Sequence, residues 1–204
     1  MNKIIKSLLL ILSLFILFYL LTLTYSFTNI YLSFKQENHI NLQNFIDKKK
    51  ISTNFKKQLN TIIYEKVQKE ALLKIIYSLD EKTFDIFIND YINKLSDYLS
   101  DEKILISLYK NPEIIKNQID SFKLKQTQIL HNSEVPTSPT EILDKKKFHL
   151  VGPNIKELYN DTNFFFFTSL ENFMLDFSHK DINIIIKLNL DKVLWKISSV
   201  EIKF

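Results

Sequence analysis

The sequence predicts an α+β protein that is tethered to a membrane by a single N-terminal helix. Three observations predict this layout. An uncharged apolar stretch lies near the N-terminus, helical apolar spacing follows it to about residue 127, and a two-residue alternation begins after residue 148. Helices followed by antiparallel strands are typical of an α+β fold. We therefore expect a helical region packed on a C-terminal antiparallel β-meander of three to four strands.

The N-terminal stretch is long enough to cross a bilayer. No charged side chain occurs between Lys6 and Lys35, and a helix from Ser7 to Phe27 would span about 30 Å, the thickness of a hydrocarbon core. We interpret residues 1–27 as a membrane anchor or uncleaved signal, followed by a single domain over residues 28–204. The alternative is a cleaved signal peptide, with a conceivable cleavage site at Thr24-Tyr25-Ser26.

The charges around this stretch predict its orientation. Lys3, Lys6 and the amino terminus lie on one side, whereas Lys35 on the other side is balanced by Glu37. The positive-inside rule then favours a cytoplasmic N-terminus and an extracytoplasmic domain. For a bacterial chain this means a single-pass protein of the inner (cytoplasmic) membrane with its body in the periplasm. The reverse topology, with a cytoplasmic body, is the alternative.

Composition excludes several kinds of chemistry. The 204 residues contain no Cys, which excludes disulfides, thiolate zinc sites and a cysteine nucleophile. Every cation of the net charge of +4 is Lys, and the absence of Arg, the usual bidentate reader of phosphate and guanine, argues against a nucleic-acid partner. The single Gly, Gly152, excludes a glycine-rich phosphate loop.

Helices are predicted from apolar positions that recur on one face. Asn38 is a plausible N-cap for a short helix that carries Ile40, Phe45 and Ile46. The next helix has the apolar face Phe55, Leu59, Ile62, Ile63 and Val67. A third has the stripe Phe84, Phe87, Ile88, Tyr91, Leu95, Tyr98 and Leu99. Asp80 and Ser100 are expected to cap the starts of this helix and the following one, and Asn111-Pro112-Glu113 to open a last helix.

The C-terminal part is predicted to form strands after a linker. Residues 130–147 contain Pro136 and Pro139 in a polar context and are expected to be a flexible linker. Residues 182–190 alternate apolar and polar side chains, residues 173–177 do the same, and "FFFFTSL" is a further strand. Turns are expected at 179–181 and 189–192. In the last strand the alternation of Trp195 and Ile197 slips at Ser198-Ser199, as in a β-bulge. We expect Trp195 to be buried.

Three stretches carry a resemblance to a known family. They are "ENHINLQNFIDKKKISTNFKKQLN", with its pairs Ile46-Asp47 and Gln58-Leu59, "NDYINKLSDYLSDEKILISL", and "VLWKISSVEIKF", with the pair Trp195-Lys196. In this order they resemble an uncharacterised bacterial family, domain of unknown function 2939, whose members join an N-terminal membrane segment to a small extracytoplasmic domain. Lys48 and Ser52 depart from the family's aromatic residue and Arg. The resemblance implies a layout and no catalytic residue.

Candidate reactive residues are few and have simpler structural interpretations. The histidines His39, His131, His149 and His179 show no metal-binding spacing. Asp47 is interpreted as a helix-terminal structural carboxylate, and the pair Asp176 and His179 lacks an identifiable nucleophile or pocket. We therefore predict no catalytic, cofactor-binding or metal-binding residue, and no cofactor.

Two remaining features bear on a binding function. The cluster Lys48, Lys49, Lys50, Lys56 and Lys57 is either a solvated face or a contact for anionic lipid headgroups. The aromatic run from Phe164 to Phe167 is interpreted as core, or as the lining of an apolar pocket. The sequence thus favours a membrane-anchored, non-enzymatic module that binds a protein partner. The alternative is a carrier of a small apolar or lipid ligand held between sheet and helices, and an enzyme is the least supported class.

Overall fold

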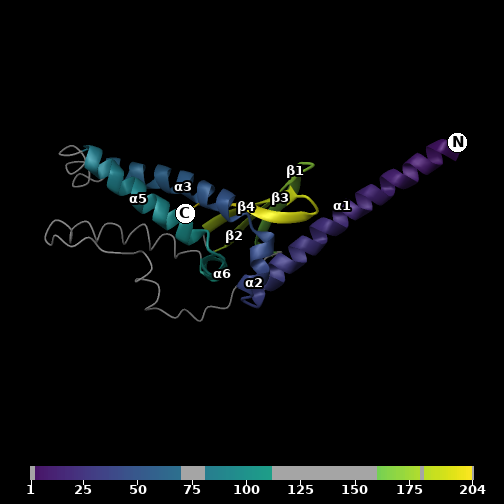
Figure 1. The fold of residues 1–204 in the computed structure, drawn as a ribbon, viewed down its shortest axis with the longest axis horizontal. Coiled ribbons are helices and arrows are strands. Elements are labelled where there is room, and N and C mark those ends of the chain that lie inside the picture. The colour runs from purple at the N-terminus through teal and green to yellow at the C-terminus, as the bar shows by residue number, and fades with distance from the viewer. Residues whose placement is uncertain (1–2, 70–80, 112–159, 180–181, 204) are drawn as a thin grey trace.

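The computed structural model describes residues 3–69, 81–111, 160–179 and 182–203, and it confirms the α+β layout (Figure 1). Its helices are α1 (Lys3–Lys35), α2 (His39–Leu42), the 3-10 turn η1 (Gln43–Phe45), α3 (Lys48–Lys69), α5 (Glu81–Leu99) and α6 (Glu102–Lys110). Its strands are β1 (Thr162–Ser169), β2 (Asn172–His179), β3 (Ile182–Asp191) and β4 (Leu194–Lys203). The predicted linker at 130–147 and the helix expected after Pro112 lie outside the described residues.

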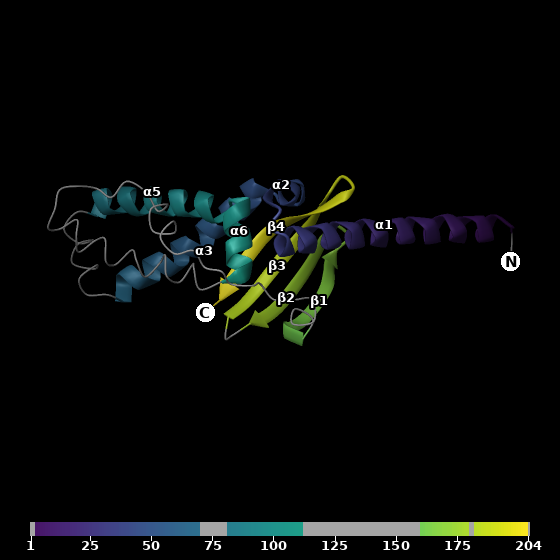
Figure 2. The same ribbon diagram turned by 90° about the horizontal axis from the view of Figure 1, so that it is seen from below.

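Helix α1 is one continuous element with two different halves. It is long and apolar enough to cross a membrane, by length and composition. All side chains from Ile4 to Phe18 are exposed, and this half extends away from the rest of the fold in both views (Figures 1 and 2). From Tyr19 onward the helix lies against the sheet, and Ser26, Ile30, Ser33 and Phe34 are buried. The helix therefore continues well past Phe27, where the anchor was predicted to end.

The four strands form one antiparallel meander in the order β1-β2-β3-β4. The predicted β-bulge is present, because Lys187 pairs with Ser199 while Leu188 pairs with Ile197, which leaves Ser198 unpaired. The strand β3 continues to Asp191, so the predicted turn at 189–192 is wrong in position and the actual turn is Lys192–Val193. The turn Leu170–Glu171 connects β1 to β2. Because successive strands of a meander alternate in direction, the β1–β2 turn and the β3–β4 turn lie at the same end of the sheet.

One core cluster joins the sheet to α1, α3, α5 and α6, and its part around Trp195 lies between α1 and one face of the sheet. As expected, Trp195 and Ile197 are fully buried, and after the bulge Val200 and Ile202 are buried again. The Trp195 ring makes edge contacts with Tyr19 at 5.5 Å and with Phe167 at 6.0 Å, measured between ring centroids. Its indole Nε1–H donates to Thr22 Oγ1 (3.3 Å), and its backbone N–H donates to the buried Ser26 Oγ (3.0 Å). The single tryptophan thus ties α1 to the sheet.

Helices α3 and α5 pack side by side and extend beyond the β4 edge (Figure 1). The predicted apolar faces meet here, since Phe55, Leu59, Ile63 and Val67 of α3 and Phe84, Ile88, Leu95 and Leu99 of α5 are all buried. Side-chain hydrogen bonds link the helices, among them those from Tyr64 to Asp85 (2.9 Å) and from Ser52 to Asp97 (2.7 Å). Ile40, expected on an apolar face, is instead exposed.

The outer edge of β4 is closed by polar groups from the helical region. The Gln58 amide donates to the Val200 carbonyl (2.7 Å) and accepts from the Ile202 N–H (3.1 Å). The Asp47 N–H donates to the Ile197 carbonyl (2.8 Å). A sheet edge with satisfied backbone groups does not recruit further strands. These contacts give Gln58 and Asp47 structural roles.

The helix caps agree only in part with the sequence prediction. Asn38 caps α2 as expected, because its side chain accepts from the Asn41 N–H. The prediction that Ser100 caps the next helix is wrong. Asp101 is the N-cap of α6 and accepts from the Lys103 N–H (3.0 Å), whereas the Ser100 hydroxyl turns back to the Asp97 carbonyl. A carboxylate at this position also favours the positive end of the helix dipole.

Truncation of Trp195 should destabilise the protein strongly. Trp195→Ala removes a fully buried ring and its indole hydrogen bond to Thr22, while the backbone bond to Ser26 can remain, and such truncations cost about 3–5 kcal/mol. Urea unfolding of the full chain in detergent micelles, followed by circular dichroism, measures this. Ile86→Ala, at an exposed apolar position of α5, is the control and should stay within about 0.5 kcal/mol of the parent. Equal midpoints for the two variants would contradict the assignment.

Gln58→Leu should also lower the free energy of unfolding, for a different reason. It keeps the helix but leaves the Val200 carbonyl and the Ile202 N–H without their partner, at a cost of about 1–3 kcal/mol. The matched control is Gln68→Leu, at an exposed position of the same helix. The same unfolding measurement applies, and a loss that is no larger than in the control would rule out the edge-closing role.

Candidate functional site: an apolar groove beside the anchor helix

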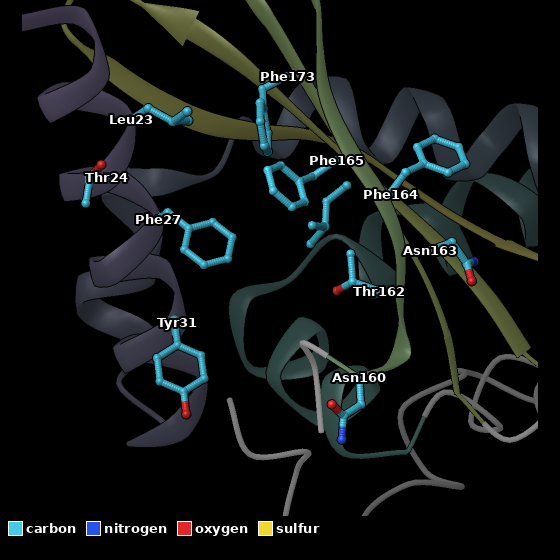
Figure 3. A pocket seen from close by; sticks show the side chains of 11 residues that line it. Leu23, Thr24, Phe27, Tyr31, Asn160, Thr162, Asn163, Phe164, Phe165 and Phe173 are labelled. Atoms are coloured by element: carbon cyan, nitrogen blue, oxygen red, sulfur yellow. The ribbon is translucent and has the colours of Figure 1, made fainter. Parts of the chain in front are cut away.

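A groove of about 870 Å³ lies between α1 and the hairpin β1–β2. Helix α1 supplies one wall, and β1 and β2 supply the other (Figure 3). The lining residues are Leu23, Thr24, Phe27, Tyr31, Asn160, Thr162, Asn163, Phe164, Phe165, Phe173 and Leu175. Known small-molecule sites have volumes of about 300–1,000 Å³ and mostly apolar walls, so this groove has the size and lining of a ligand site.

Aromatic side chains dominate one end of the groove and polar groups the other. Phe27 of α1 and Phe165 of β1 extend toward each other from opposite walls, with Leu23 and Phe173 beyond them (Figure 3). The ring centroids of Phe165 and Phe173 lie 6.3 Å apart. Tyr31, Thr162 and Asn160 stand at the opposite end (Figure 3). The lining therefore has an apolar end toward the free half of α1 and a polar end away from it.

The groove borders on a second, smaller cavity. This cavity of about 90 Å³ lies between α1, α6 and the sheet, and it shares Phe27, Tyr31 and Leu175 with the groove. Its remaining described lining is made of apolar and aromatic side chains such as Ile30, Phe34 and Leu108. The two spaces together extend the apolar surface from the open groove into the core.

The described lining of the groove carries no charged side chain. The polar end offers the Tyr31 hydroxyl, the Thr162 hydroxyl and the Asn160 amide, which can donate and accept hydrogen bonds. An anionic headgroup buried there would find no cationic side chain in the described lining, and an unpaired buried charge is costly; the Lys35 Nζ lies outside this lining, 6.0 Å from the centroid of the Tyr31 ring. This chemistry suits a neutral amphiphile, with an apolar chain and an uncharged polar group.

The lysine cluster identified in the sequence is divided by ion pairs. Lys48 lies 3.3 Å from Asp101 and 3.7 Å from Glu102. Lys50 lies 3.4 Å from Asp47 and also donates to Asn189 (3.0 Å). Such exposed pairs contribute little stability, but they lower the net charge of this patch. The five lysines therefore do not form one uninterrupted cationic surface.

A different basic group surrounds the turn between β3 and β4. Lys196 pairs with Asp191 at 2.7 Å, and Lys192 occupies the turn itself. Hydrogen bonding and charge attraction from Lys196 lower the pKa of Asp191, and Lys192 and Lys50 add to this effect. The charges of three lysines therefore act on the Asp191 carboxylate, although only Lys196 is paired with it and Lys50 is paired with Asp47. Sequence reasoning did not identify this group because Lys50 is far from the others along the chain.

The candidate catalytic residues have structural surroundings. The Asp47 carboxylate accepts from the Lys50 N–H (3.1 Å) in the first turn of α3, as expected for a helix-terminal carboxylate. Asp176 is buried and accepts from Asn163 (2.9 Å). His39 begins α2 and His179 ends β2, whereas His131 and His149 lie outside the described residues. In the described part of the chain, no three His, Asp or Glu side chains gather in a way that could hold a metal.

Sequence reasoning missed the role of the polar side chains of α1. Thr22, Ser26, Asn29 and Ser33 recur at helical spacing and lie on one face. Thr22 and Ser26 bind Trp195, and Ser33 accepts from the Asn41 amide (2.7 Å). The signal was present as a stripe of small polar residues within an apolar helix, which is typical of a helix that is approached closely by its neighbours.

No protein-family model, curated protein sequence or solved structure matches the chain. The resemblance to domain of unknown function 2939 therefore stays a prediction.

Proposed function

We propose that this protein is a membrane-anchored, non-enzymatic binding protein that holds the apolar chain of a neutral lipid in the groove between α1 and β1–β2. The observation that carries the proposal is the position of the groove, one wall of which is the same helix that can cross the membrane. A lipid chain can therefore pass from the bilayer to the groove along α1 without crossing water. The sequence alone favoured a protein-binding module, because no convergent set of polar residues marked a pocket.

The proposal includes retention of the anchor. Cleavage at Thr24-Tyr25-Ser26 would remove Tyr19 and Thr22 from the Trp195 ring, and would remove Leu23 from the groove. A signal peptide is not expected to contribute side chains to the core of the mature domain. The packing of α1 thus supports an anchor that stays attached, in the inner membrane with the body in the periplasm, as the flanking lysines favour.

A second candidate function is the docking of a protein strand. Strand β1 is at the edge of the described sheet, and its residues Phe164 to Phe167 are all exposed. Exposed edge strands can pair with an extended segment of a partner. This possibility keeps the protein-binding module as the alternative, with β1 in place of the groove as the binding element.

The lipid proposal predicts that Phe165 matters for binding and its neighbour Phe166 does not. Phe165→Ser removes an aromatic wall of the groove, whereas Phe166 stacks on Phe164 (5.5 Å) and is absent from the groove lining. Loss of one buried phenylalanine contact corresponds to about tenfold weaker binding. Native mass spectrometry of full chain released from detergent measures the lipid that co-purifies, and a fluorescent acylglycerol measures the affinity.

The control variant is Phe166→Ser, which changes the same residue type on the same strand. We expect it to keep the lipid mass and the probe affinity of the parent protein. An apo mass for the parent protein, with no saturable probe binding, would reject the lipid proposal. Equal losses in both variants would favour the strand-docking alternative, since both residues then act through β1 as a whole.

The topology is tested by reporters fused after Phe204. Alkaline phosphatase should be active there, and a reporter that works only in the cytoplasm should be inactive, because the positive-inside rule places Lys3 and Lys6 in the cytoplasm. The intact mass of the protein from carbonate-washed membranes should include residues 1–26. Activity of the cytoplasmic reporter alone would reverse the topology, and a mass that begins near residue 27 would show cleavage.

A further inference from the structure

We propose that the two turns at one end of the sheet insert into the membrane surface, with Leu170 and Val193 among the lipid chains and Lys50, Lys192 and Lys196 facing anionic headgroups. The inference rests on the proposed anchoring of α1, and it does not depend on what the groove binds. It makes the sheet itself a membrane-contacting element.

The first argument is the length of the free half of α1. The exposed segment from Ile4 to Phe18 is about 22 Å long, whereas the hydrocarbon core is about 30 Å thick and needs about 20 residues. This length is an upper value, because the segment from Ile4 includes Lys6, whose charged end must extend back to the membrane interface. The membrane must therefore extend past Phe18 along the helix, to about the level of Leu23.

The second argument is what lies at that level. The Tyr19 hydroxyl donates to the Leu170 carbonyl (2.6 Å), so the turn β1–β2 touches the helix at the first residue that the domain covers. Trp195, two residues after Val193, contacts Tyr19 and Thr22. Both turns lie beside α1 at the end of the sheet from which its free half emerges (Figure 2). A membrane that covers α1 to Leu23 consequently meets both turns.

The third argument is the chemistry of the turns. Leu170 is 83% exposed and Val193 is 56% exposed, at tips where a water-facing turn usually carries polar residues. Just behind the Val193 tip, Lys196 pairs with Asp191 and Lys50 pairs with Asp47, and Lys192 in the turn itself adds a third cation. Apolar tips with a basic rim are typical of surfaces that contact anionic membranes. The adjacent α1 residues Leu20 and Leu21 are exposed as well and complete the apolar surface.

These dimensions agree with one another. The part of α1 from Tyr19 to Leu23 is about 8 Å long by helical rise. This equals the difference between the free half of α1 and the thickness of the hydrocarbon core. Interfacial elements bury their apolar side chains about 5–10 Å into the headgroup and acyl boundary. Seating the turns at this depth brings the anchor to a full span, and it also places the apolar end of the groove directly above the lipid chains.

The absence of cysteine allows a direct test with single-cysteine variants. Leu170→Cys, Val193→Cys, Ile11→Cys and Ile86→Cys are each labelled with an environment-sensitive fluorophore, and the full chain is reconstituted in vesicles of mixed neutral and anionic lipid. Ile11 reports the anchor, and the exposed Ile86 on α5 reports the aqueous domain. Lipids with spin labels at the headgroup or along the chain, and aqueous iodide, serve as quenchers.

We expect the probes at 170 and 193 to be quenched by lipids labelled near the headgroup and to be shielded from iodide, unlike the probe at 86. Lys192→Gln should weaken this lipid quenching only in vesicles that contain anionic lipid, and Lys82→Gln, on the exposed start of α5, should not change it. If the probes at 170 and 193 respond to iodide as the probe at 86 does, while the probe at 11 is in lipid, the inference is overturned and the anchor remains. An aqueous probe at 11 would overturn both.

Discussion

The structure depends on the contact between Trp195 and the second half of α1. A helix in lipid needs only apolar side chains, and a helix in a protein core needs a shape that fits its neighbours. The two halves of α1 meet these two demands in turn. Its first half, up to Phe18, exposes Leu, Ile and Phe side chains. In its second half, Thr22 and Ser26 accept hydrogen bonds from the indole and backbone N–H groups of Trp195. Because α1 also covers the inner face of the sheet, the domain has no complete core without its anchor.

This arrangement fixes the domain with respect to α1. A domain on a flexible tether can tumble, but here the last free residue of α1 is followed directly by Tyr19, which is bonded to the turn at Leu170 and packed against Phe167 at 5.6 Å. The groove and the turns therefore have fixed heights along the helix. In the anchoring that we propose for α1, helical rise therefore sets the distance of the groove and the turns from the bilayer.

Sequence periodicity was sufficient for the elements but not for their assembly. The stripe of α5, the alternation of β3 and the slip at Ser198 are local patterns, and each one appears in the structure. The groove could not be predicted, because it joins Phe27 to Phe165 across more than half of the chain. The end of the anchor was also missed, since hydropathy does not distinguish a lipid-facing Leu from one that faces a sheet. The uncharged stretch up to Lys35 was a usable clue, since at about 42 Å it exceeds one bilayer core.

The two edges of the described sheet differ in how they are covered, and this difference supports the side of the domain at which we propose binding. At β4, Gln58 and Asp47 satisfy the backbone and α3 covers the strand. At β1, the described residues instead present four consecutive phenylalanines that are 41–63% exposed. Apolar area left in water costs about 25 cal/mol per Å², and strand edges of this kind favour association. An apolar partner at β1 would remove that cost, whether it is a lipid chain on the α1 side or another strand at the edge, so the proposed binding accounts for an edge that stability alone would not favour.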